Sequence, residues 1–336
     1  MPKPDILARL EATAAVYQEA SLLAAGAELD VFTVLLQHSN RLTAGELSQI
    51  ISTDLRGTAC LLDALAAAGY LVKKDDAYSV ADDFQDYLDR RSPVTYIPMI
   101  RHRACVQRAW TRLSEAVKTG TPPKTEPSIL GAAEDRNSFI WAMNSVAQHI
   151  AGDVLESLRS AGLLSFQKLL DIGGASGTYT QAFLNALPKS AVTIFDLPVG
   201  IAAARKRFTA SEYEQRVQFA EGDILKNDFP TGFDFAWISA IIHQFDSAEC
   251  RILYQKTYQA LNPGGKVAVR DFIMHSDRTQ PKAGAFFGVD MLVETPHGQV
   301  YTFDEVRSGL ESAGFSNVEL AVPAETMSAV VAAVRK

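Results

Sequence analysis

Residues 168–178 read KLLDIGGASGT, an apolar run that enters a glycine-rich turn and then a polar stretch suited to begin a helix. This pattern predicts a buried strand, a tight turn and a helix. Further strands are expected at residues 191–196, 217–221, 233–238 and 266–272, with helical stretches between them. Such alternation predicts an α/β fold with a doubly wound, mostly parallel sheet, which binds its ligand beyond the carboxyl ends of the strands.

The turn itself separates two kinds of nucleotide ligand. Its glycines do not fit G-x-G-x-x-G, because Ile172 stands where the first glycine is needed. Asp171 lies at the mouth of the turn, where its carboxylate would repel the pyrophosphate of a dinucleotide. S-adenosylmethionine carries an ammonium and a sulfonium instead. The sequence therefore favours this cofactor over the alternative of a dehydrogenase, with backbone contacts from the turn residues Gly173, Gly174, Ala175 and Gly177.

Acidic residues also end the next two strands. Asp196, followed by Leu197, stands where a carboxylate takes the ribose hydroxyls in related sheets. Asp223, followed by Ile224, offers an acceptor for the adenine amino group and an apolar cover for the ring. Three acids at successive strand ends strengthen the prediction of a cofactor site.

The first hundred residues predict a different architecture. Thr43 and Glu46 form a capping-box pattern, Asp54 opens a second helix, and two short strands follow near residues 70–72 and 78–80. This is the winged-helix order. A DNA-binding regulator is the alternative that it raises, but the second helix has no basic stripe, and we favour a structural or dimerising role. We expect domains at residues 1–98, 99–160 (a helical connector) and 161–336.

The composition of the chain restricts the classes of partner and site that we expect. The net charge of −7 argues against nucleic acid, and no apolar run is long enough for a membrane span. The three cysteines are far apart and no histidine has ligand spacing, so neither a disulfide framework nor a metal site is expected. The N-terminus does not look like a signal peptide, and we expect a cytoplasmic protein.

Taken together, the motifs LLDIGGASGTY, FDLP, EGDIL, IIHQFD, LNPGGKV and TPHGQVYTFDE resemble one family over nearly the whole chain. It is the metal-independent small-molecule O-methyltransferases of the caffeic acid and acetylserotonin type. The resemblance implies a homodimer formed through the N-terminal domain. It also implies methyl transfer to a hydroxyl of an aromatic or polyketide-like small molecule.

The resemblance also assigns the catalytic residues. His243, just past the fourth strand, matches the catalytic histidine, and an imidazole titrates in the range that a general base needs. Asp271 matches one of two acids that orient it, whereas the second position is Val300. Ser239 replaces a lysine that helps to hold the cofactor. These departures leave C- or N-methylation open. The expected walls of the acceptor pocket are Met143, Met291, Trp110, Phe139 and Phe287.

Overall fold

The computed structural model describes residues 6–336, without the side chains of Asn137 and Ile140; residues 1–5 of the expected first domain lie outside it. The chain folds as two compact units. The first comprises the described part of Met1–Arg108 together with Thr125–Val146, and the second comprises Ala109–Lys124 together with Ala147–Lys336. The residues expected as a connector, 99–160, are thus divided between the two units.

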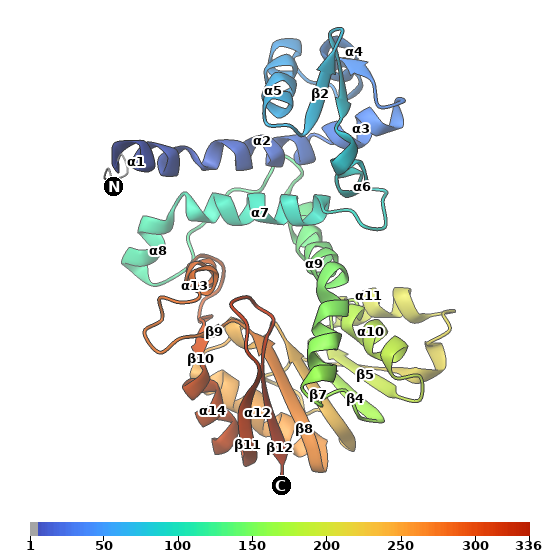
Figure 1. The fold of residues 1–336 in the computed structure, drawn as a ribbon, viewed down its shortest axis with the longest axis vertical. Helices are drawn as coiled ribbons and strands as arrows, with labels where there is room; N and C mark the ends of the chain where they lie inside the picture. Colours follow the sequence, from blue (N-terminus) through green and yellow to red (C-terminus); the bar gives the residue numbers. More distant parts are fainter. Residues whose placement is uncertain (1–5) are drawn as a thin grey trace. The chain divides into compact units, whose positions relative to one another are not determined.

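The first part of the chain is mostly helical (Figure 1). Its elements are α1 (Ile6–Ala15), α2 (Tyr17–Glu28), α3 (Val31–Gln37), β1 (Leu42–Thr43), α4 (Ala44–Ile50), α5 (Leu55–Ala67), β2 (Leu71–Lys74), β3 (Ala77–Val80), a 3-10 turn (Asp82–Phe84), α6 (Gln85–Leu88), α7 (Ile97–Trp110), α8 (Leu113–Thr119) and α9 (Ala132–Ser160).

The predicted winged helix is confirmed between α3 and β3. Thr43 and Glu46 form the capping box of α4, and the Asp54 side chain caps α5 by accepting from the Gly57 amide. Strands β2 and β3 pair as an antiparallel wing, and β1 joins the far side of β3. The core of this domain is built from large apolar side chains that are fully buried, among them Phe32, Leu35, Leu47, Leu62 and Leu65.

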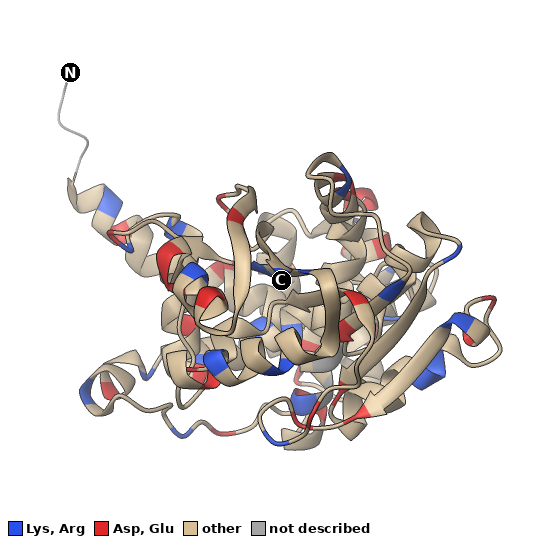
Figure 2. Ribbon diagram, turned by 90° about the horizontal axis from the view of Figure 1, so that it is seen from below, with Lys and Arg blue, Asp and Glu red and all other residues tan. Residues whose placement is uncertain are grey.

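The acidic residue in the middle of α5 is paired with groups of the wing. Asp63 of α5 accepts hydrogen bonds from the Lys73 ammonium and from the Tyr78 hydroxyl, both at 2.7 Å. Over the ribbon as a whole, basic and acidic residues are interspersed (Figure 2). None of the described helices is long and apolar enough to cross a membrane.

The second unit carries a seven-stranded sheet in the order β11-β12-β8-β7-β4-β5-β6 (Figure 1). From β8 to β6 the neighbouring strands are parallel, as the sequence predicts, whereas β12 pairs antiparallel with both β8 and β11. The strands are β4 (Lys168–Ile172), β5 (Ala191–Asp196), β6 (Val217–Glu221), β7 (Phe233–Ser239), β8 (Leu261–Asp271), β9 (Ile273–Met274), β10 (Tyr301–Thr302), β11 (Phe315–Val322) and β12 (Ala329–Arg335).

Helices cover both faces of this sheet, which confirms the doubly wound prediction. The last turns of α9 pack on one face with α10 (Thr178–Ala186) and α11 (Pro198–Phe208). On the other face lie α12 (Ser247–Ala260) and α14 (Phe303–Ser312). Alternation along β4 explains the layering, since Leu169 joins the first core and Leu170 the second. The carboxyl ends of β4, β5, β7 and β8 therefore meet at one edge, where the predicted site residues lie.

Candidate active site

The glycine-rich turn joins β4 to α10 at this edge. Gly173 and Gly177 have left-handed φ angles of 72° and 77°, and Gly177 caps α10. Gly174 is required for another reason. A Cβ atom there would lie 2.8 Å from the Asp171 carboxylate and 2.9 Å from the Ile194 side chain. The backbone at Gly174 therefore packs directly against the Asp171 carboxylate, which precedes the turn.

Asp171 is almost completely buried beneath this turn, with 2% of its surface exposed. Its carboxylate accepts a hydrogen bond of 2.6 Å from the Thr180 hydroxyl in the first turn of α10. Burial raises the pKa of Asp171 to about 7, against the lowering effect of the Thr180 hydrogen bond and with a further rise from the charge of Asp196. A cation that reached Asp171 would therefore be strongly favoured by the carboxylate.

Asp196, at the end of β5, closes the turn from the other side. Its two oxygens accept from the Ala175 and Leu197 amides, each at 2.7 Å. Burial raises the pKa of Asp196, and these two amides oppose the rise. Each oxygen keeps a lone pair for a further donor. The Leu197 side chain beside it is 49% exposed, an apolar surface next to a carboxylate.

Asp223 differs from the other two strand-end acids. Its carboxylate lies 2.8 Å from the Lys226 ammonium and accepts from the Leu225 amide. The Lys226 hydrogen bond lowers the pKa of Asp223. A hydrogen bond from Ala175 ties Asp196 to the turn, and Asp171 packs against Gly174 of the turn, whereas no such contact ties Asp223 to it among the described residues. Ile224, half-buried, contributes its carbonyl oxygen to the Lys256 ammonium.

His243 and Asp271 are brought together at the ends of β7 and β8. The His243 Nδ1 atom lies 2.9 and 3.0 Å from the two Asp271 oxygens, and the Phe272 amide holds one of them at 2.8 Å. Both residues are buried, with 7% and 1% of their surfaces exposed. The Phe287 ring packs edge-on against the imidazole, 4.7 Å between ring centres. This arrangement fixes the imidazole orientation and leaves Nε2 as its reactive nitrogen.

Val300 stands at the position where the resemblance places a second acid, and its side chain has no group that could accept a hydrogen bond from His243. Its carbonyl oxygen accepts from the Arg278 guanidinium, and its side chain is buried beside Gly288. Among residues 6–336, the carboxylate that contacts the His243 ring is that of Asp271. The imidazole is therefore oriented by a single acid that uses both of its oxygens.

Sequence reasoning missed a buried cation at the same edge. Arg270 is the last residue but one of β8, directly before Asp271; it is 4% exposed and donates from Nη1 to the Ser239 hydroxyl at 2.9 Å. Ser239 is also its register partner on β7. The guanidinium stands over the Tyr179 ring, 5.4 Å from the ring centre, in the first turn of α10. The signal was present in the sequence as an arginine within an apolar strand, VAVRDF.

The predicted acceptor residues fall into two groups. Phe287 and Met291 lie on α13 (Lys282–Glu294) in the second unit, together with Trp110. The Trp110 indole donates to Asp290 on the same helix at 2.6 Å, a buried carboxylate that the sequence analysis did not single out. Phe139 and Met143 lie on α9 in the first unit; Phe139 is 44% exposed and meets the His102 ring edge-on.

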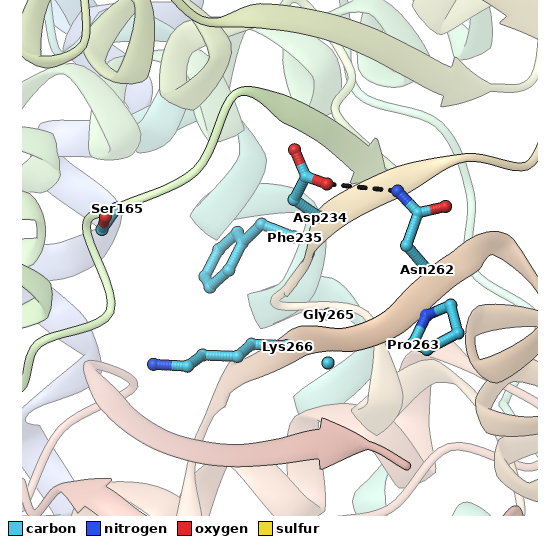
Figure 3. A pocket seen from close by; sticks show the side chains of 8 residues that line it. Ser165, Asp234, Phe235, Asn262, Pro263, Gly265 and Lys266 are labelled. Atoms are coloured by element: carbon cyan, nitrogen blue, oxygen red, sulfur yellow. Dashed lines mark hydrogen bonds between the residues drawn. The ribbon is translucent and has the colours of Figure 1, made fainter.

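A separate cavity of about 220 Å³ lies at the other edge of the sheet (Figure 3). It is lined by the residues that begin β7 and β8, including Asp234, Asn262 and Lys266, and Asn262 donates to Asp234 at 3.1 Å. His243 and Asp271 follow the opposite ends of these strands. The cavity is therefore remote from the candidate chemistry. Residues 6–336 contain no cluster of three metal-ligating side chains.

The strand-end edge fits S-adenosylmethionine and not a dinucleotide. A buried carboxylate (Asp171) and a half-buried one (Asp196) lie against the turn, and the buried Arg270 guanidinium has an Nε atom with no hydrogen-bond partner among the described residues. Comparison with known proteins identifies the family. Residues 116–316 match the O-methyltransferase domain, and residues 13–85 match the O-methyltransferase dimerisation domain. The chain belongs to the O-methyltransferase family. The enzyme is thus a methyltransferase that depends on S-adenosylmethionine.

Individual relatives agree with this assignment. The enzyme is 30% identical to acetylserotonin O-methyltransferase of Gallus gallus over 87% of both chains. It is 32% identical to the tetracenomycin polyketide synthesis 8-O-methyl transferase of Streptomyces glaucescens, over 92% of this chain and 91% of the relative. Human N-acetylserotonin methyltransferase, solved in complex with its cofactor, has the same fold, with a TM-score of 0.84 at 24% identity over 99% of both chains.

Proposed function

We propose that the enzyme methylates a hydroxyl group on an aromatic or polyketide-like small molecule, with His243 as the general base. The observation that carries this proposal is the buried contact of His243 Nδ1 with both oxygens of Asp271. It supports the tautomer with a proton on Nδ1, so that Nε2 is free to accept a proton from the acceptor. The named substrates of the relatives, acetylserotonin and an aromatic naphthoate, support the substrate class.

In this proposal the bound cofactor supplies an electrophilic methyl group on a sulfonium. The chain's own residues do the rest. Asp171 takes the cofactor ammonium, Asp196 the ribose hydroxyls, and Asp223 with Ile224 the adenine. The glycine turn contributes backbone amides. With S-adenosylmethionine bound, the acceptor oxygen would take its methyl group and S-adenosylhomocysteine would leave, while His243 Nε2 would accept the proton of the acceptor hydroxyl.

We place the acceptor against Phe287 and Met291 of α13, with Trp110 of the same unit as a further wall. Apolar walls with few polar groups suit an aromatic ring. Phe287 supports this position because its ring contacts both the imidazole and the Phe272 ring. An acceptor that lay on Phe287 would have its hydroxyl within reach of His243.

We also propose a homodimer formed through the N-terminal domain, residues 1–98, within which residues 13–85 match the dimerisation domain. The helices α1 and α2 support it, because both expose large apolar side chains: Leu7 and Leu10 are 69% and 61% exposed, and Tyr17 is 59% exposed. Sedimentation velocity at micromolar concentration should give the mass of two chains; a single-chain mass would contradict the proposal.

A panel of phenols, naphthols and hydroxyquinones tests the reaction, with release of S-adenosylhomocysteine as the readout. His243→Ala should lower kcat by about 100- to 10,000-fold with the best acceptor and leave the dissociation constant of S-adenosylhomocysteine unchanged. The matched control is His275→Ala, an exposed histidine beside Glu325. Full turnover by His243→Ala would overturn the base role, and transfer to carbon or nitrogen in the product would overturn O-methylation.

A further inference from the structure

We infer that Arg270 binds the α-carboxylate of the cofactor's methionine group and thereby replaces the missing cation at position 239. The inference deepens the proposed function, since it rests on the cofactor lying against the glycine turn. Arg270 and its contact residues Ser239 and Tyr179 all belong to the second unit.

Arg270 carries a buried positive charge. Arg270 is 4% exposed, and its guanidinium donates a hydrogen bond to a neutral hydroxyl, that of Ser239. Among the described residues no carboxylate forms an ion pair with it, and its Nε atom is buried without a hydrogen-bond partner. A buried charge that lacks an opposite charge is costly, and natural proteins rarely retain one. A ligand with a negative group would relieve that cost.

The second step is position. Ser239 and Arg270 are register partners at the carboxyl ends of adjacent parallel strands, and the Ala240 amide donates to the Arg270 carbonyl. The guanidinium also stands over Tyr179, which lies in the first turn of the helix that follows the glycine turn. Arg270 is therefore held between the ends of β7 and β8 and the start of α10. This is the edge at which Asp171 and the turn lie.

The third step is the chemistry of the ligand. The methionine group of the cofactor is a zwitterion, with an ammonium and a carboxylate on one carbon. Asp171 provides a buried negative partner for the ammonium. Asp171 and Arg270 both lie close enough to the Tyr179 hydroxyl to act on its pKa, Arg270 lowering it and Asp171 raising it, so the two charges are near neighbours. A guanidinium binds a carboxylate through parallel N–H bonds, so Arg270 supplies the complementary positive partner.

Isothermal titration calorimetry with two ligands tests the inference. S-adenosylhomocysteine carries the carboxylate, and its decarboxylated analogue differs only by lacking that group. The wild-type enzyme should bind S-adenosylhomocysteine about 10- to 100-fold more tightly than the analogue. Arg270→Met should abolish this preference by weakening S-adenosylhomocysteine alone. Ser239→Lys in the Arg270→Met background should restore much of the preference, because the cation returns on the register-partner strand.

Arg216→Met is the matched control, because its guanidinium also stands over a tyrosine ring, that of Tyr213, but donates to carbonyls near residues 184–190. This control should keep the wild-type preference. Equal weakening of both ligands by Arg270→Met, or an unchanged preference, would overturn the inference. If Arg270→Met does not fold, Arg270→Lys must show a reduced preference with the analogue's affinity unchanged. Failure of wild-type enzyme to bind either ligand would instead contradict the cofactor site itself.

Discussion

The glycine turn after β4 and the histidine after β7 lie at the same edge of one sheet, yet their polar groups are in different states. At the turn, burial raises the pKa of Asp171 to about 7, and the buried Arg270 keeps an unpaired nitrogen. At the histidine, His243 and Asp271 already satisfy one another, and Phe287 packs against the imidazole. The glycine turn with Asp171 and Arg270 is here named the cofactor end, and His243 with Asp271 the transfer end. The difference is consistent with a cofactor end whose charges are paired by the ligand and a transfer end whose charges are paired within the protein.

The largest expected effect is a loss of kcat caused by a substitution in the transfer end alone. Asp271→Asn should lower kcat by about 100-fold, because an amide can donate to Nδ1 and so favour the wrong tautomer of His243. The dissociation constant of S-adenosylhomocysteine, measured by calorimetry, should stay within about twofold of wild type.

The control for this variant is Asp304→Asn, which removes an exposed acid paired with Arg307. It should retain wild-type kcat. If Asp271→Asn weakened the binding of S-adenosylhomocysteine as much as it lowered kcat, the two ends would not be separable.

An intermediate effect concerns the pH dependence of cofactor binding. The pKa of Asp171 is raised to about 7 in the free protein, and a bound ammonium favours the ionised carboxylate. Affinity for S-adenosylhomocysteine should therefore be lost as the pH falls through this value, by about tenfold between about pH 8 and pH 6.

Asp171→Asn should remove most of this slope in titrations at matched ionic strength. Asp223→Asn should keep it, because Lys226 lowers the pKa of Asp223 and that carboxylate stays ionised throughout the range. A wild-type affinity that does not change with pH would show that Asp171 is ionised before the ligand binds, and the contrast between the two ends would lose its electrostatic basis.

The smallest expected effect concerns the pH dependence of kcat when an acid is placed at position 300. Val300→Glu puts a carboxylate at the position of the second acid, and a negative charge near His243 raises the pKa of the imidazole. The acidic limb of the kcat profile should move to higher pH, with a change in kcat of about two- to fivefold.

Val300→Gln is the control of nearly equal shape without the charge. Val300→Gln should show no shift in the pH profile of kcat. The same profile for both variants would mean that position 300 does not act on His243 electrostatically.

Much of the fold was predictable because its signals are local. Apolar runs marked the parallel strands, and capping boxes marked the winged helix, which the structure reproduces at Thr43 and Glu46. The antiparallel pair β11 and β12 was not predicted, although β12 is an apolar run. Such a run does not say which strand it will pair with, and its place beside β8 follows from packing across the sheet.

The order of the parallel strands, the strand-end acids, the glycine turn and the histidine could be identified from the amino-acid sequence, since each depends on residues close together in the chain. How those groups are charged and paired depends on the tertiary structure. Ser239 and Arg270 are 31 residues apart and meet because β7 and β8 are in register. Trp110 and Asp290 are 180 residues apart. Burial, which raises the pKa of Asp171, is likewise set by everything that packs around a group and not by its neighbours in sequence.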